Sequence, residues 1–145
     1  ATQTRRIANR PTVACIEWID PLMAAGNWTP TLVNMAGGTN LFGESGHHAP
    51  LLDWDALRAA DPDILIILPC GFDLATTICE MPALMDRPGW GKLRAVRDNN
   101  VFVTDGNQYF NRPGPRLIDS LEILAEIIHP DLFDFGHQYS GWQRL

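Results

Sequence analysis

Residues 61–72 read DPDILIILPCGF, and this segment decides the fold of the chain. The opening Asp-Pro-Asp ends a preceding helix, and residues 64–68 are then five consecutive apolar residues. An apolar run of this length is typical of a parallel strand that is covered on both faces. A proline, a cysteine, a glycine and Phe72 follow the run. We therefore expect a central strand whose carboxyl end opens at residues 69–72.

Two further strands are predicted on either side of this one. Residues 13–17 and 101–103 are short apolar runs that begin with valine, a β-branched residue common in strands. Residues 41–42 form a brief additional apolar element. The strands are separated by stretches long enough for helical crossovers.

Helices are expected between these strands. One covers residues 29–36 and ends at two glycines, and a second covers 53–60 with Asp53 as its N-cap. A third covers 73–84 and is interrupted by Pro82, and a short one covers 90–96. The last helix begins at residues 113–115 and ends before His129. It carries four apolar residues at helical spacing, namely Leu117, Leu121, Leu124 and Ile128.

Alternation of strands and helices predicts one three-layer α/β domain with a mainly parallel sheet and right-handed crossovers. The 145 residues suit a single domain, and 46% hydrophobic with 19% charged residues is a globular composition. No run approaches the roughly 20 apolar residues of a membrane span, so no membrane insertion is expected. A net charge of -6 without a basic stripe argues against nucleic acid as a partner.

The cysteines do not indicate a metal site. Cys15, Cys70 and Cys79 form an odd set without paired CxxC spacing. Cys15 and Cys70 lie in apolar runs, where cysteine usually acts as a small buried hydrophobe.

Ligands of parallel sheets bind beyond the carboxyl ends of the strands, so the residues that follow the three strands are the candidate site. The site would combine aromatic rings with amide and charged groups, a mixture that suits a large, partly apolar ligand held by a few hydrogen bonds. The alternative is that the rings only close the end of the core, and that Arg112 pairs with Asp105 or Asp119 rather than with a ligand. The residues concerned are Glu17, Trp18, Trp28, Phe72, Asn107, Tyr109, Phe110, Asn111 and Arg112.

Enzyme motifs fit poorly. Ser45 lies in a Gly-Glu-Ser-Gly run, but the strand and helix that a nucleophile elbow needs are not predicted around it. No GxGxxG, P-loop or HExxH motif is present. His47 and His48 are adjacent, so an extended loop would point them apart. A metal-dependent enzyme that uses Glu44, His47 and His48 remains the alternative from a different functional class.

Five runs carry a resemblance to a known family. They are EWIDPLMAAGNWTP (17–30), MAGG (35–38), DWDALRAADPDILIILPCGF (53–72), RPGWGKLRAVR (87–97) and DGNQYFNRPGPRLIDSLEILAEIIHP (105–130). Together they resemble the second lobe of bacterial cobalamin-binding proteins, the helical-backbone class of ABC-transporter substrate-binding proteins. The resemblance covers nearly the whole chain, and PCGF and DGNQYFNRPGPR are its most specific blocks.

The resemblance implies a Rossmann-like lobe that is one half of a two-lobed protein. Residues 1–10 would be the end of the interlobe helix or a lead-in, and residues 11–145 the C-terminal ligand-binding lobe. A missing N-terminal lobe or a second copy would cover the cleft face. The implied function is to bind a corrinoid, cobalamin or cobinamide, and to deliver it to an ABC permease, without catalysis or a catalytic cofactor. Haem and iron-siderophore complexes are the alternative ligands. The implied compartment is periplasmic or otherwise extracytoplasmic, and a cytoplasmic carrier stays open.

The resemblance also implies residue roles. It places Asp55 at an acidic position that docks an arginine of the permease, with Asp53 two residues away as the alternative. Leu51 stands where relatives carry an aromatic residue. The resemblance places Glu17, Trp18, the loop 43–51, Phe72 and residues 109–112 towards the ligand. Together with Trp28 and Asn107 from the strand-end argument, the candidate ligand residues are Glu17, Trp18, Trp28, His48, Pro50, Leu51, Phe72, Asn107, Tyr109, Phe110, Asn111 and Arg112.

Overall fold

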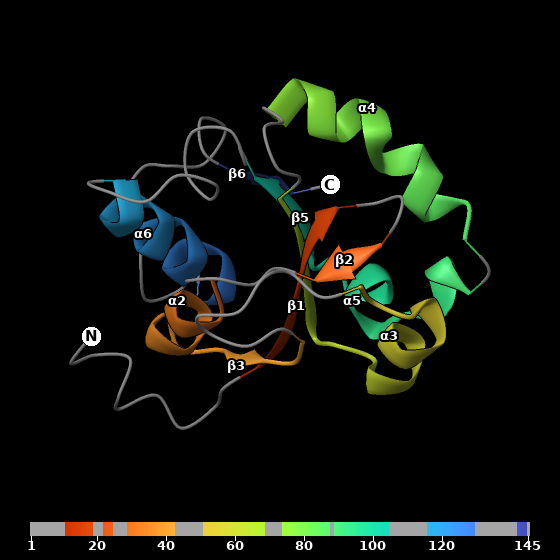
Figure 1. Ribbon diagram of the computed structural model, residues 1–145, viewed down its shortest axis with the longest axis horizontal. Coiled ribbons are helices and arrows are strands. Elements are labelled where there is room, and N and C mark those ends of the chain that lie inside the picture. Colours follow the sequence, from red (N-terminus) through yellow and green to blue (C-terminus); the bar gives the residue numbers. More distant parts are fainter. Residues whose placement is uncertain are drawn as a thin grey trace.

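A parallel sheet forms the centre of the molecule, as residues 61–72 predicted (Figure 1). In this computed structural model the structure describes residues 11–18, 22–24, 29–42, 51–68, 74–87, 89–104, 116–129 and 142–144. The three predicted strands are β1 (Thr12–Trp18), β4 (Ile64–Ile67) and β5 (Val101–Thr104). Every residue of β4 and β5 is buried, which explains their unbroken apolar sequences.

The pairing of these strands confirms the predicted parallel sheet. β4 lies between β1 and β5 and pairs with both in parallel. Three shorter strands complete the described sheet: β2 (Met23–Ala24), β3 (Thr39–Asn40) and β6 (Trp142–Arg144). β2 and β6 are antiparallel, while β3 pairs in parallel with the start of β1, and the order along the sheet is β2-β1-β4-β5-β6.

The sequence did not predict these short strands. An apolar element was expected at residues 41–42. The residues that pair with β1 are instead Thr39 and Asn40 of β3, which directly precede it. Gly38 explains this position, because a Cβ there would lie 2.9 Å from Cγ2 of Val13. The chain can approach β1 closely enough to pair only because this residue has no side chain.

Two helices cover one face of the sheet, α2 (Thr29–Met35) and α6 (Arg116–Ile128). They lie together on the left of the sheet in Figure 1 and cover one hydrophobic core. Leu124 and Ile128, two of the four apolar residues predicted on one face of the last helix, are part of this core. Trp142 of β6 packs into this core edge-on against Phe102, with ring centroids 5.6 Å apart. Its indole Nε1 donates a hydrogen bond of 3.2 Å to Oε2 of the buried Glu126 in α6.

The other face carries α3 (Trp54–Ala60), α4 (Leu74–Met85), the 3-10 helix η1 (Trp90–Lys92) and α5 (Arg94–Arg97). Asp53 caps α3 as predicted, because its side chain accepts a hydrogen bond from the backbone N–H of Asp55. The expected helix over 90–96 is two short helices, because Leu93 between them is extended.

The expected interruption at Pro82 was wrong. α4 continues to Met85, and the backbone N–H of Asp86 still donates to the carbonyl of Pro82 at 3.0 Å. Met81 and Leu84 on either side of the proline are buried in the core of this face. Their packing holds the helix together across the hydrogen bond that proline cannot make.

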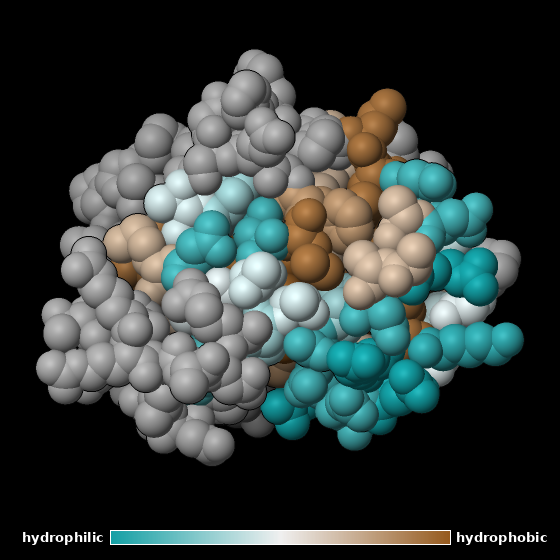
Figure 2. Space-filling model, turned by 90° about the horizontal axis from the view of Figure 1, so that it is seen from below, coloured by the Kyte–Doolittle hydropathy of each residue, from teal (hydrophilic) through white to brown (hydrophobic). Residues whose placement is uncertain are grey.

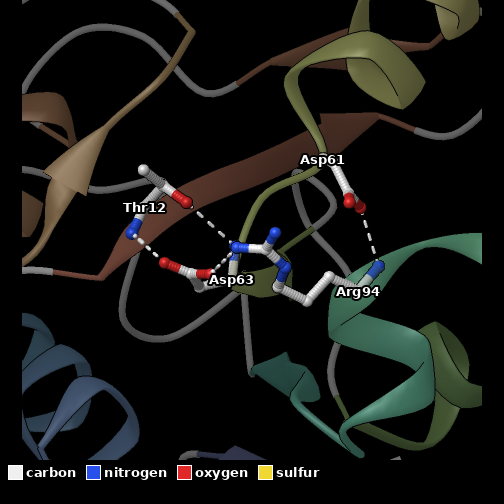
Figure 3. A network of polar contacts seen from close by, with 4 residues as sticks. All are labelled: Thr12, Asp61, Asp63 and Arg94. Carbon is white, nitrogen blue, oxygen red and sulfur yellow. Dashed lines mark hydrogen bonds and ion pairs between the residues drawn. The ribbon is translucent and has the colours of Figure 1, made fainter.

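A polar network joins the amino ends of β1 and β4 to α5 (Figure 3). The backbone N–H of Thr12 donates to Asp63 at 3.0 Å, and the N–H of Asp63 donates to the Thr12 hydroxyl at 2.9 Å. Arg94 is ion-paired with Asp63 at 3.0 Å, and its backbone N–H donates to Asp61 at 2.7 Å. Figure 2 views this amino-end side of the molecule, where hydrophilic residues gather on the side of α3 and α5, beside a band of hydrophobic surface.

Candidate functional site

The carboxyl ends of the three central strands lie in register. Ile67 of β4 is paired with Ile16 of β1 and with Val103 of β5. One residue further on, the backbone N–H of Leu68 donates to the carbonyl of Ile16 at 2.8 Å. The hydroxyl of Thr104 contacts the carbonyl of Ile67 at 3.4 Å. The segments that follow these strands therefore leave the sheet at one edge.

Glu17 and Trp18 lie at this edge, where β1 meets β2. Ile16 pairs with Ala24. Trp18, two residues further along β1, pairs with Met23, which is only one residue from Ala24 in β2. Glu17 is therefore an extra residue in β1, a β-bulge. Bulges bend the strand and turn a side chain in a new direction, and they are common beside binding sites.

Leu51 joins the same edge through Met23. The two residues form an antiparallel bridge, and the backbone N–H of Leu52 donates to the carbonyl of Leu22 at 2.8 Å. Leu51 is 74% exposed, whereas Leu52 is buried in the core. The structure thus brings Trp18 and Leu51, two predicted ligand residues 33 positions apart in the sequence, to either side of Met23.

Met23 is a residue that sequence reasoning missed. A two-residue antiparallel strand has no recognisable periodicity of its own. The available signal was that Met23 lies in an apolar run directly after the strand that ends at Trp18, with Pro21 marking a turn between them.

Burial affects the chemistry of the edge. Glu17 is partly buried, and the loss of hydration raises the pKa of its carboxyl above the usual range. Cys15, two residues earlier, is buried as predicted, and desolvation raises the pKa of its thiol to about 12. A thiol with this pKa is a packing group and not a nucleophile at neutral pH.

All the other predicted ligand residues lie outside the described residues. They are Trp28, His48, Pro50, Phe72, Asn107, Tyr109, Phe110, Asn111 and Arg112, and Glu44, His47 and Cys70 lie outside them as well. Their roles therefore stay predictions. In the part of the chain that the structure describes, no group of three or more His, Cys, Asp or Glu could hold a metal ion.

Asp55 is exposed in the first turn of α3, with 81% of its side chain accessible. Arg58, one turn later, lies 3.6 Å from its carboxylate. The two residues line a surface hollow of about 320 Å³ together with Ala59, Asp61, Gly89, Lys92 and Leu93. The acidic position is accessible to a partner, but it is accompanied by cations that the family resemblance did not indicate.

Comparison with protein families decides the class of the chain. The model of the periplasmic binding protein family matches residues 2–108. The chain belongs to the periplasmic binding protein family. Its members are binding proteins, so the alternative of a metal-dependent enzyme on Glu44, His47 and His48 is set aside. Among the described residues of this periplasmic binding protein, no helix has the length and apolar character needed to cross a membrane.

Three individual proteins illustrate the relationship. An uncharacterised ABC transporter substrate-binding lipoprotein, YvrC of Bacillus subtilis (strain 168), is 43% identical over 79 residues, which are 54% of this chain and 22% of that protein. A periplasmic heme-binding protein from Pseudomonas aeruginosa has a TM-score of 0.67 and 25% identity over 89% of this chain. The periplasmic vitamin B12-binding protein BtuF of Vibrio cholerae has a TM-score of 0.67 and 17% identity over 90% of it. The chain spans about half the length of these two structures, 46% and 48%.

Proposed function

We propose that the chain is the C-terminal ligand-binding lobe, residues 11–145, of an extracytoplasmic substrate-binding protein that serves an ABC permease. The family assignment and the lipoprotein relative support this reading. The match to about half the length of each compared structure supports the division into lobes, with residues 1–10 leading in from an interlobe helix. Asp55 remains our candidate for the contact with the permease.

We further propose that the ligand is a corrinoid. The observation that carries this proposal is the edge at the carboxyl end of β1, where Met23 pairs with Trp18 on one side and with the exposed Leu51 on the other, beside the partly buried Glu17. This edge offers apolar surface and a hydrogen-bond acceptor, and a corrinoid has an apolar ring edged with amide groups. The second candidate is haem, because the Pseudomonas aeruginosa structure has the higher sequence identity of the two compared.

Equilibrium dialysis of the natural full-length protein tests the ligand. Cobalamin, cobinamide, haemin and a ferric siderophore would each be measured by absorbance, and the 145-residue chain would be measured beside the full-length protein. We expect cobinamide or cobalamin to bind most tightly, and to bind the chain alone more weakly because it offers half of the cleft. Binding of haemin or of the siderophore without corrinoid binding would replace the corrinoid assignment by that ligand.

A further inference from the structure

The surface hollow between α3 and η1 brings charges of both signs together. Asp55 and Arg58 come from α3, Asp61 is the C-cap of that helix, and Lys92 comes from η1. The hollow measures about 320 Å³, and charged residues make up more than half of its described lining. Pockets for small molecules are mostly apolar, so this hollow is better suited to charged side chains of a protein partner.

Gly89 at the floor of the hollow fixes the place of Arg58. Its φ of 84° is left-handed, and a Cβ on this glycine would lie 2.6 Å from Nε and 2.9 Å from Cζ of Arg58. The guanidinium therefore lies against the backbone of the turn before η1, where only glycine leaves room for it. The Arg58 side chain is 42% exposed, against 81% for Asp55, so the cation lies deeper in the surface than the carboxylate.

This position of Arg58 affects the contact that we propose for Asp55. Nη1 of Arg58 is only 3.6 Å from the Asp55 carboxylate. An arginine that approached Asp55 on its own would come close to this guanidinium, in a hollow that Lys92 also lines. Like charges at such distances repel, and they repel more strongly once a protein contact excludes water. A carboxylate beside the incoming arginine would offset this repulsion and pair with the two cations.

We infer that the hollow docks a pair of opposite charges on the permease: Asp55 receives a cation, and Arg58 and Lys92 receive a carboxylate that lies next to that cation. This inference rests on the proposed function, because it takes the partner to be an ABC permease. The family resemblance indicates an arginine at Asp55 and nothing further. The geometry of Arg58 adds the requirement for an acidic residue in the partner.

Arg58→Ala separates this arrangement from docking by an arginine alone. If the permease presents only an arginine, removal of Arg58 takes away a like charge and should strengthen docking. If the permease also presents a carboxylate, the same substitution removes the partner of that carboxylate and should weaken docking by about fivefold or more. Lys92→Ala is a second variant in a different element and should act in the same direction.

The experiment measures docking in proteoliposomes. The natural full-length protein, empty and loaded with cobinamide, is titrated against the ABC transporter of the source organism whose ATP hydrolysis the wild type stimulates. The half-maximal concentration for stimulation reports docking. The variants are Asp55→Ala, Arg58→Ala and Lys92→Ala, and the control is Arg97→Ala. Arg97 is exposed in α5 and is not among the described residues that line the hollow, so its loss removes the same charge from another surface.

We expect each of the three hollow variants to raise the half-maximal concentration by about fivefold or more, and Arg97→Ala to leave it within about twofold of wild type. The melting temperature and the dissociation constant of cobinamide should change little in all four variants. The substituted side chains are exposed, and none of them lies at the candidate ligand edge. If Arg58→Ala does not fold, Lys92→Ala decides the result.

Three results would overturn the inference. The first is an unchanged half-maximal concentration in folded Arg58→Ala and Lys92→Ala variants. The second is a lower half-maximal concentration in these variants with a higher one in Asp55→Ala, which would assign the hollow to an arginine alone. The third is an equal increase in Arg97→Ala, because the effect would then come from net charge. A wild type that stimulates no ABC transporter would instead overturn the proposed function, and the inference with it.

Discussion

Neighbouring residues of this chain have opposite environments, and Leu51 and Leu52 are the clearest pair. Leu51 is 74% exposed at the candidate edge, and Leu52 is 9% exposed in the core beneath α3. The bridge to Met23 and the hydrogen bond from Leu52 to Leu22 hold this alternation in place. Leu51 therefore lies on the surface of the candidate edge, and Leu52 contributes to the core.

Substitution of each leucine by alanine should separate binding from stability. We expect Leu51→Ala to change the free energy of unfolding by less than about 0.5 kcal/mol and to weaken corrinoid binding by about tenfold, because an apolar ligand contact is lost. Leu52→Ala should cost about 2–5 kcal/mol of stability through the cavity that it leaves. Thermal melts and cobinamide titrations of both variants check this. Unchanged binding by a folded Leu51→Ala variant would remove Leu51 from the site.

At the scale of elements, β6 is held by a side-chain hydrogen bond in addition to its pairing with β5 and its packing. The indole N–H of Trp142 reaches the buried carboxylate of Glu126 at 3.2 Å, so the last described strand is tied to α6 across the core. Arg144, two residues on, stacks over the ring of Phe102 at 5.2 Å. β6 is thereby joined to α6 through Trp142 and to β5 through Arg144.

Loss of the indole donor should weaken this tie. We expect Trp142→Phe to lower the free energy of unfolding by about 1–3 kcal/mol, because the buried carboxylate of Glu126 loses a donor. Glu126→Gln is the matched control, since its amide oxygen can still accept from the indole and should cost less. Chemical denaturation of the two variants makes the comparison. Equal stability of Trp142→Phe and wild type would show that the contact contributes nothing.

At the scale of the whole molecule, the two ends of the sheet carry different polar groups. The amino ends of the strands are closed by the network of Thr12, Asp61, Asp63 and Arg94 (Figure 3). The carboxyl ends carry the partly buried Glu17, at the bulge between β1 and β2. The network at the amino ends therefore contributes to the stability of the fold, whereas a ligand role for Glu17 at the carboxyl ends stays a prediction.

The network should make stability depend on pH. Partial burial alone would raise the pKa of Asp63, but the hydrogen bonds from Thr12 and the charge of Arg94 outweigh it and lower the pKa. A lowered carboxyl pKa stabilises the fold above the unfolded value of about 3.9 and loses this effect as pH falls through the folded value. Asp63→Asn should thus melt below wild type at pH 7, by an amount equivalent to about 1 kcal/mol or less because the pair is partly exposed to solvent.

Thermal melts of wild type and Asp63→Asn between pH 7 and pH 3 measure this dependence, with Glu80→Gln as the control. The difference between wild type and Asp63→Asn should shrink below about pH 4. A difference that stays constant over this range would mean that packing, and not the charge of Asp63, is responsible.

Local sequence was sufficient wherever a signal lay within one element. The unbroken apolar run of β4, the N-cap at Asp53 and the glycine stop after α2 each predicted an element that the structure contains. The parallel sheet followed from the alternation of these elements. The position of the candidate edge followed from the general rule for the carboxyl ends of parallel strands.

Only the tertiary structure decided how distant residues meet. The sequence by itself determined the three central strands and most of the helices. It also determined that Glu17 and Trp18 lie at the end of one strand. It could not reveal that β2 pairs with β1 through a bulge, that Met23 lies between Trp18 and Leu51, or that α4 continues through Pro82. Strands of two or three residues and helices across a proline have little stability of their own, so they form where packing and hydrogen bonds from the rest of the chain outweigh local preference.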